Sequence, residues 1–144
     1  MTTSKSLTTI KIEKIKKPKK SELKDLLDDF KREISDLNED WDGEGAKKII
    51  EETFKKVVNF LVDLNQKCRK ARLGSIILPQ IFPGTAGEIE LQWNTDRFKL
   101  VVIIPENEKA TAIYYATDYA DGKIKGTLEL EKLYQIYITC LRMF

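Results

Sequence analysis

The sequence predicts an α+β fold with two N-terminal helices, an antiparallel β-meander of three to five strands and a C-terminal helix. Apolar residues recur at helical spacing over residues 22–37 and 46–70. From residue 87 onward they alternate with polar residues, as they do in strands. Helical spacing then returns over residues 130–142. Helices and strands grouped in this way are typical of α+β domains.

The length and composition indicate one globular domain. The chain has 144 residues, of which 42% are hydrophobic and 33% charged, and such a chain is able to form a buried core. We expect residues 1–20 to form a basic arm or an edge strand and residues 21–144 to form a single α+β domain. Twenty-five Lys and Arg residues against twenty-three Asp and Glu residues leave a net charge of +2. This total indicates neither a nucleic acid nor a membrane as a partner.

The predicted arm is rich in lysine. The alternation of Thr8-Thr9-Ile10-Lys11-Ile12 fits an edge strand whose charges oppose aggregation, and a solvated tail is the other structural interpretation. Contact with nucleic-acid phosphates is the functional alternative. The lysines that would make this contact are Lys11, Lys14, Lys16, Lys17, Lys19 and Lys20.

The two N-terminal helices are predicted from their apolar stripes. The first covers residues 22–37, with Ser21 as its N-cap. Its stripe consists of Leu23, Leu26, Leu27, Phe30, Ile34 and Leu37. The second covers residues 46–70 and ends in basic residues before a stop at Gly74. Its apolar surface is wider, so we expect it to be the central helix.

The segment Trp41-Asp42-Gly43-Glu44-Gly45-Ala46 predicts a tight turn that leads directly into the second helix. Asp42 is expected to accept hydrogen bonds there, while Gly43 and Gly45 adopt positive φ or pack closely beneath Trp41. The substitution Gly45→Val should therefore destabilise the fold through backbone strain and through crowding of the helix start. Trp41 and Trp93 are expected to mark the two halves of one core. We interpret all of these residues as structural.

The sheet is expected to begin within residues 76–84, where Pro79 and Pro83 exclude a helix and allow only an irregular or edge strand. Three further strands are expected, at residues 87–93, 98–104 and 110–117. Asn94-Thr95-Asp96 and Asp121-Gly122 are turn signals at the ends of strands. The C-terminal helix should close one face of this meander.

The absence of histidine limits the catalytic and metal-binding sites that the chain is able to form. It removes imidazole catalysis, His-ligated zinc and every Ser-His or Cys-His nucleophile. The enzymatic alternative is a carboxylate-based, metal-dependent enzyme. Its acidic residues would be Asp42, Glu44, Glu88 and Glu90. A solvated strand face is the simpler interpretation of Glu88 and Glu90, because Ile89 and Leu91 occupy the other face. We expect no catalytic residue, no metal and no cofactor.

Tyrosines near two lysines also have two interpretations. Aromatic side chains beside basic ones are able to stack on bases, but in a strand they are usually cross-strand packing partners. The residues concerned are Tyr114, Tyr115, Tyr119, Lys123 and Lys125.

The cysteines and the hydropathy indicate the compartment. Cys68 and Cys140 lack metal-ligand spacing and are expected to be free thiols in a reducing environment. No apolar stretch has the length of a membrane span, and the N-terminus lacks the apolar region of a secretory signal. These features predict a cytoplasmic protein.

Three blocks of sequence resemble a family of small uncharacterised prokaryotic proteins. They are Trp-Asp-Gly-x-Gly-Ala before a helix, Leu78-Pro79-Gln80-Ile81-Phe82-Pro83, and Gly87-Glu88-Ile89-Glu90-Leu91-Gln92-Trp93. The resemblance spans residues 40–104. It implies a bacterial or archaeal cytosolic protein of the mobile-element, toxin–antitoxin or phage-defence kind. Gln92 and Ala86 stand where the family carries acidic residues, which weakens a catalytic role for this cluster.

The function expected from the sequence is that of a non-catalytic protein-interaction module, antitoxin-like or immunity-like in its concrete form. Its support is the lack of histidine, nucleophile motif, metal spacing and nucleotide loop. Such a module should expose an apolar patch or a free sheet edge. Nucleic-acid binding through the arm lysines and a carboxylate-based metal enzyme are the alternatives. The oligomeric state is left open by the sequence.

Overall fold

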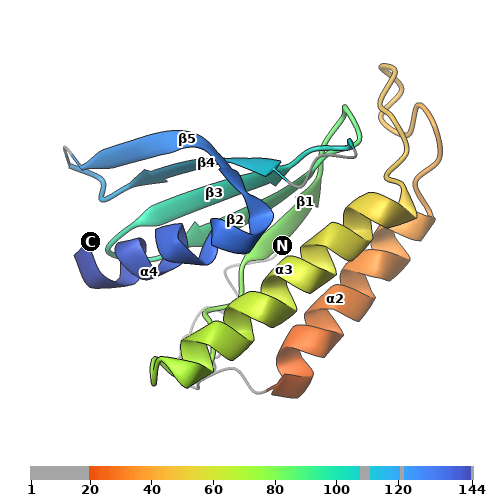
Figure 1. Cartoon of the computed structure of the whole chain (residues 1–144). Helices are drawn as coiled ribbons and strands as arrows, with labels where there is room; N and C mark the ends of the chain where they lie inside the picture. Colours follow the sequence, from red (N-terminus) through yellow and green to blue (C-terminus); the bar gives the residue numbers. More distant parts are fainter. Residues whose placement is uncertain (1–19, 108–110, 121, 144) are drawn as a thin grey trace, which may run out of the picture.

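A computed structural model describes residues 20–107, 111–120 and 122–143 (Figure 1). Its elements confirm the predicted α+β class: along the chain, two N-terminal helices precede a sheet, and a C-terminal helix follows it. They are α2 (Lys20–Ser35), α3 (Glu51–Lys70), β1 (Gln80–Pro83), β2 (Ile89–Asn94), β3 (Lys99–Ile104), β4 (Thr111–Thr117), β5 (Lys123–Glu129), the 3₁₀ turn η2 (Leu130–Lys132) and α4 (Tyr134–Met143). The expected strand at Thr8–Ile12 and the arm lysines up to Lys19 lie outside the described residues.

The sheet is a five-stranded antiparallel meander in the order β1-β2-β3-β4-β5. Each strand pairs with its neighbour in sequence, since short turns connect them. The proline-punctuated segment contributes the short edge strand β1, one of the two forms that the sequence allows. Pro83 lies at the end of this strand, where a missing N–H is tolerated.

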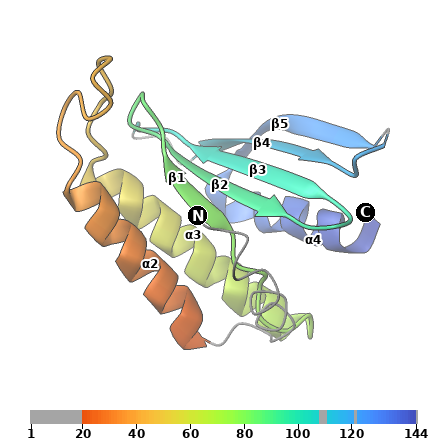
Figure 2. The same cartoon turned by 180° about the vertical axis from the view of Figure 1, so that it is seen from behind.

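The helices form a layer on one face of the sheet. In both views α3 and α4 lie on the same side of the strands, and α2 packs against α3 (Figures 1 and 2). The rings of Phe30 on α2 and Phe54 on α3 stack with centroids 6.3 Å apart. No described element lies over the opposite side of the sheet. The predicted closure of one face by the C-terminal helix is therefore shared with α3.

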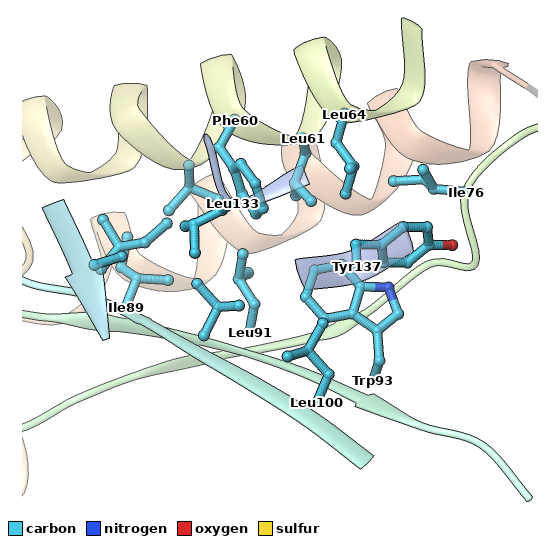
Figure 3. Packing of buried hydrophobic residues seen from close by; sticks show 14 of the residues in the cluster. Phe60, Leu61, Leu64, Ile76, Ile89, Leu91, Trp93, Leu100, Leu133 and Tyr137 are labelled. Carbon is cyan, nitrogen blue, oxygen red and sulfur yellow. The ribbon is translucent and has the colours of Figure 1, made fainter. Parts of the chain in front are cut away.

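The core lies between the sheet and the helices (Figure 3). Leu91 and Leu100 reach it from the strands, and Leu61 and Leu64 reach it from α3. Trp93 is fully buried against Tyr137 of α4, in an edge-on contact with ring centroids 5.6 Å apart. Aromatic side chains arranged in this way stabilise a core beyond their apolar burial.

Two aromatic side chains fix the segment that leads from α3 to the sheet. The indole Nε1–H of Trp93 donates to the carbonyl of Ile77 at 2.7 Å, and the backbone N–H of Ile77 donates to the Tyr137 hydroxyl at 2.9 Å. Both backbone groups of Ile77 are thereby satisfied beside the core. Trp93 thus has the structural role expected from the sequence.

The second helix begins later than the predicted start at residue 46. α3 begins at Glu51, and residues 46–50 are not helical. The N–H of Lys47 donates to the Thr85 carbonyl at 2.8 Å, and the Ala46 carbonyl accepts from the Asp40 N–H at 2.6 Å. These bonds hold the chain in a loop against the β1–β2 turn, so its backbone groups are not free for helical pairing.

The prediction that Trp41 belongs to the core is wrong. This residue is only half-buried and lies outside the core cluster, with its indole N–H donating to the Lys47 carbonyl at 3.0 Å. It therefore closes the loop that follows α2, whereas Trp93 alone belongs to the core.

Other helix ends also differ from the predicted ones. α2 includes Ser21, so this residue is not the N-cap. At the end of α3 the left-handed residue is Arg72, with φ of 61°, and the Leu73 N–H donates back to the Cys68 carbonyl at 2.9 Å. This is a Schellman-type end in which arginine takes the usual place of glycine. Gly74 follows two residues later.

Candidate protein-interaction surface

The glycine-rich turn is held together by its own carboxylates. Asp42 Oδ1 accepts from the N–H groups of Glu44 at 2.8 Å and Ala46 at 3.0 Å, and Asp40 Oδ1 accepts from Gly45 at 2.6 Å. The hydrogen bond from Glu44, followed by that from Ala46, lowers the pKa of the Asp42 carboxyl. Asp42 is thus the acceptor that the sequence predicts.

The glycines of this turn serve backbone conformation. Gly43 and Gly45 have φ of 75° and 90°, and a side chain added at either position would meet no atom within 4 Å. The predicted strain at Gly45 therefore has a structural basis. The predicted crowding of a helix start is wrong, because open space surrounds this position and α3 begins later.

The proposed acidic site receives no support from the described geometry. The Asp42 carboxylate is engaged in the turn, Glu88 Oε1 accepts from the Ala86 N–H at 2.8 Å, and Glu90 accepts from the side chain of Gln92. Among the described residues no cluster of three or more acidic, Cys or His side chains is suited to a metal ion. Asp42, Glu44, Glu88 and Glu90 are therefore not brought together there as one metal cluster.

The side of the sheet opposite the helices is the most distinctive surface, and we call it the open face. The strand register identifies its members by alternation. They are Gln80, Phe82, Glu90, Gln92, Asn94, Lys99, Val101, Ile103, Thr111, Ile113, Tyr115, Thr117, Lys123, Lys125, Thr127 and Glu129. The alternate residues of β2 and β3 are buried, which confirms the two-sided character of the strands.

The centre of the open face is apolar. Val101 is opposite Tyr115, and Ile103 is opposite Ile113 in the pairing of β3 with β4. Ile113 remains 48% exposed and Tyr115 37%. Phe82 is 41% exposed on the edge strand β1, where Glu90 of β2 separates it from this centre. Large apolar side chains exposed together on one surface mark interaction sites.

Charged residues lie at both ends of the open face, and Lys125 and Glu90 flank its apolar centre on β5 and β2, in the rows of Tyr115 and Ile103. Lys99, Thr117 and Lys123 share one cross-strand row, while Thr111 and Glu129 share the row at the other end. The side chains of Lys123 and Glu129 are exposed. The face therefore has a basic end and an acidic end on either side of its apolar centre.

The tyrosines predicted as one group are separated by the sheet. Tyr114 faces the helices and is half-buried, with its ring beside Gly126, whereas Tyr115 is on the open face opposite Lys125. Tyr119 lies in the β4–β5 turn and donates its hydroxyl to the Phe98 carbonyl at 3.3 Å. Tyr114 is thus the packing residue that the sequence favours, and only Tyr115 contributes to the open face.

Hollows also lie elsewhere on the described surface. A groove between α2 and α3 is lined by Leu27, Phe54 and Val62. A second hollow, between α3 and the end of β5, contains Lys56, whose Nζ donates to the Pro105 and Asn107 carbonyls at 2.7 and 2.9 Å. Burial lowers the pKa of Lys56. Its amine is engaged with backbone carbonyls and anchors the β3–β4 connection to α3.

The cysteines occur as expected. Cys68 and Cys140 are free and buried. Burial raises the pKa of both thiols, that of Cys140 to about 11. Such thiols are poor nucleophiles at neutral pH, so the core packing of these residues accounts for them.

Comparison with protein-family models, with curated proteins and with solved structures found no match. The family resemblance of the three sequence blocks therefore stays a prediction. Among the described residues, no helix is both long enough and apolar enough to cross a lipid bilayer.

The open face is a site that was not predicted from the sequence. Ile113 and Tyr115 were expected in a strand, but the strand pattern alone does not indicate which neighbours cover them. The available signal was the alternation within residues 111–117, which places Ile113 and Tyr115 together and apart from Tyr114.

Proposed function

We propose that this chain is a non-catalytic protein-interaction module that binds protein through the open face of its sheet. The observation that carries the proposal is the apolar centre formed by Val101, Ile103, Ile113 and Tyr115, in which Ile113 and Tyr115 remain exposed. Burying such a surface against a partner removes apolar area from water, at about 25 cal/mol for each Å². Charged residues at the two ends would then orient the partner.

The antitoxin-like or immunity-like role expected from the sequence is a narrower form of the same proposal. It requires that the bound protein be a toxin or a defence effector. Nucleic-acid binding is supported less well by the described surface, because Lys99, Lys123 and Lys125 share the open face with Glu90 and Glu129. A nucleic-acid platform is expected to carry a continuous basic groove.

The test compares two surface variants of the tagged full-length chain in its host lysate, with nuclease present. Ile113→Glu places a charge in the apolar centre, while Val62→Glu places one on α3, where the native side chain is 40% exposed. We expect the wild type and Val62→Glu to retain one nuclease-resistant protein in stoichiometric amount, counting an untagged copy of this chain. Ile113→Glu should lose it.

Two results would contradict the proposal. Equal retention by wild type and Ile113→Glu would remove the open face as the binding surface. Loss of retention only with Val62→Glu would assign binding to the groove between α2 and α3. Circular dichroism and the thermal midpoint of each variant establish that both are folded.

A further inference from the structure

We propose that the protein bound by the open face is a second copy of the same chain, related by a two-fold axis that lies in the interface and runs across the strands. This inference rests on the proposed function, since it names the partner of that surface. Its basis is the distribution of apolar and charged residues about the middle of the face.

The apolar centre is self-complementary about this axis. Val102, Tyr114 and Gly126 form one cross-strand row in the middle of β3, β4 and β5, and the pairs Val101–Tyr115 and Ile103–Ile113 lie on either side of it. A two-fold rotation along this row places Tyr115 of one copy over Ile113 of the other, and Val101 over Ile103. Apolar side chains then meet apolar side chains over β3 and β4, while on the flanking strands Lys125 meets Thr127 and Gln92 meets Glu90.

The charges are complementary about the same axis. Lys123 and Glu129 are each three residues from Gly126, on the same face of β5. Strand geometry separates them by roughly 20 Å, so they are too far apart to pair within one chain. The rotation brings Lys123 over Glu129 of the second copy, twice in each dimer. An axis along the strands would instead bring the two basic ends together, which like-charge repulsion disfavours.

The dimensions suit face-to-face packing. Strands about 4.8 Å apart and six or seven residues long give a face of roughly 20 Å by 20 Å. Two such sheets pack about 10 Å apart, with side chains from both copies forming a shared layer. The area is at the low end for specific complexes, which implies a dimer that dissociates on dilution.

The sheet edges suit self-association less well. β1 has four residues and ends at Pro83, and the exposed side of β5 carries Lys123 and Lys125. Short edges, prolines and lysines are devices that oppose edge-to-edge pairing. The face is therefore the better surface for a second copy.

The first experiment is sedimentation velocity of the purified full-length protein at loading concentrations from about 1 to 500 µM, the range in which weak dimers dissociate. We expect the mass to rise from 16.7 kDa toward twice that value as concentration increases. Ile113→Glu should weaken the association by about 30-fold or more, because it places a charge at the centre of the interface. Val62→Glu, on α3, should leave the association unchanged.

The second experiment tests the axis by charge reversal. Lys123→Glu and Glu129→Lys should each weaken the dimer by about five-fold, since each creates two like-charged contacts. The double variant should restore the wild-type association. Lys55→Glu, an equal change of charge at an exposed position of α3, is the matched control and should have little effect.

Each contrary result has a definite meaning. A wild type that stays monomeric at every concentration overturns the second copy as the partner. If Ile113→Glu nevertheless loses the bound protein in the lysate experiment, the proposed function stands with a different partner. If Ile113→Glu retains as much protein as the wild type there, both the proposed function and the proposed dimer are wrong. If Ile113→Glu leaves the dimer association unchanged, the dimer forms through another surface. If the double variant does not restore the association that Lys123→Glu and Glu129→Lys each weaken, the proposed axis is wrong.

Discussion

Among single residues, a few polar side chains fix the backbone conformation of the loops through hydrogen bonds. Asp42 fixes the glycine-rich turn through two backbone N–H groups. Trp93 and Tyr137 fix the segment before β1 through the two backbone groups of Ile77. In each case the side chain replaces a partner that regular secondary structure would supply. Losing that partner should therefore destabilise the fold.

Tyr137→Phe should lower the free energy of unfolding by about 1–3 kcal/mol, because the Ile77 N–H loses its acceptor while the ring remains. Urea unfolding at pH 7 measures this. Tyr119→Phe is the control, since its hydroxyl belongs to a residue that is 56% exposed, and it should change stability by less than about 0.5 kcal/mol. Equal effects of the two substitutions would contradict the role of Tyr137.

Tyr137 should also affect how the free energy of unfolding changes with pH in the alkaline range. Burial raises the pKa of this phenol from 10.0 to about 12. The folded state therefore binds a proton that the unfolded state releases first, so the contribution is complete below pH 10 and is lost as pH rises toward 12. Wild-type stability should fall more steeply than that of Tyr137→Phe across this interval. Equal slopes for the two proteins would show that the phenol is not buried as described.

Asp42 should affect the free energy of unfolding in the acid range, where its contribution is lost as pH falls. Hydrogen bonds from Glu44 and then Ala46 lower the pKa of its carboxyl below the ordinary value of 3.8. Its contribution is therefore complete above pH 3.8 and is lost as pH falls through the lower value of the folded state. Asp42→Asn keeps an acceptor oxygen but has no charge to lose. Unfolding followed from pH 5 to pH 2 should show a shallower decline for this variant than for wild type.

Among the elements, helical and strand periods predicted the helices and the strands β2, β3 and β4, because each period reflects one face packed on a core. The strand β5 was not predicted. Boundaries were predicted less well. α3 begins at Glu51 because Lys47 pairs with Thr85 and Ala46 with Asp40, and the first of these is a contact between segments far apart in sequence. Ser21 has good capping chemistry, but α2 already includes it.

The end of α3 offers a prediction at this scale. Arg72 has φ of 61°, where a residue with a Cβ is strained and glycine is not. Arg72→Gly should raise the free energy of unfolding by about 0.5–1 kcal/mol, the strain relieved exceeding the added entropy of the unfolded chain. Thermal unfolding measures the shift. Ala71→Gly is the matched control, since φ there is −81°, and it should destabilise; a loss of stability in both variants would contradict the assignment of strain to Arg72.

At the scale of the whole molecule, the fold is a sheet with helices on one side. α3 and α4 cover the face that carries Leu91, Trp93 and Leu100, and α2 extends the helical layer beside α3. The described chain supplies no second layer for Ile113 and Tyr115. An antiparallel sheet often has one solvated face, but that face is normally polar. The apolar centre of the open face is therefore the feature that both the proposed function and the proposed dimer explain.

The class of fold, the three helices, the strands β2 to β4 and the exclusion of imidazole chemistry followed from the sequence alone. Each of these follows from local pattern or from composition, which need no knowledge of neighbours. The packing of distant segments was needed to establish that β1 and β5 complete the sheet, that Trp93 is in the core while Trp41 closes a loop, where α3 begins, and which face of the meander is uncovered. Alternation shows that a strand has two faces, but the packing of distant helices decides which face is buried.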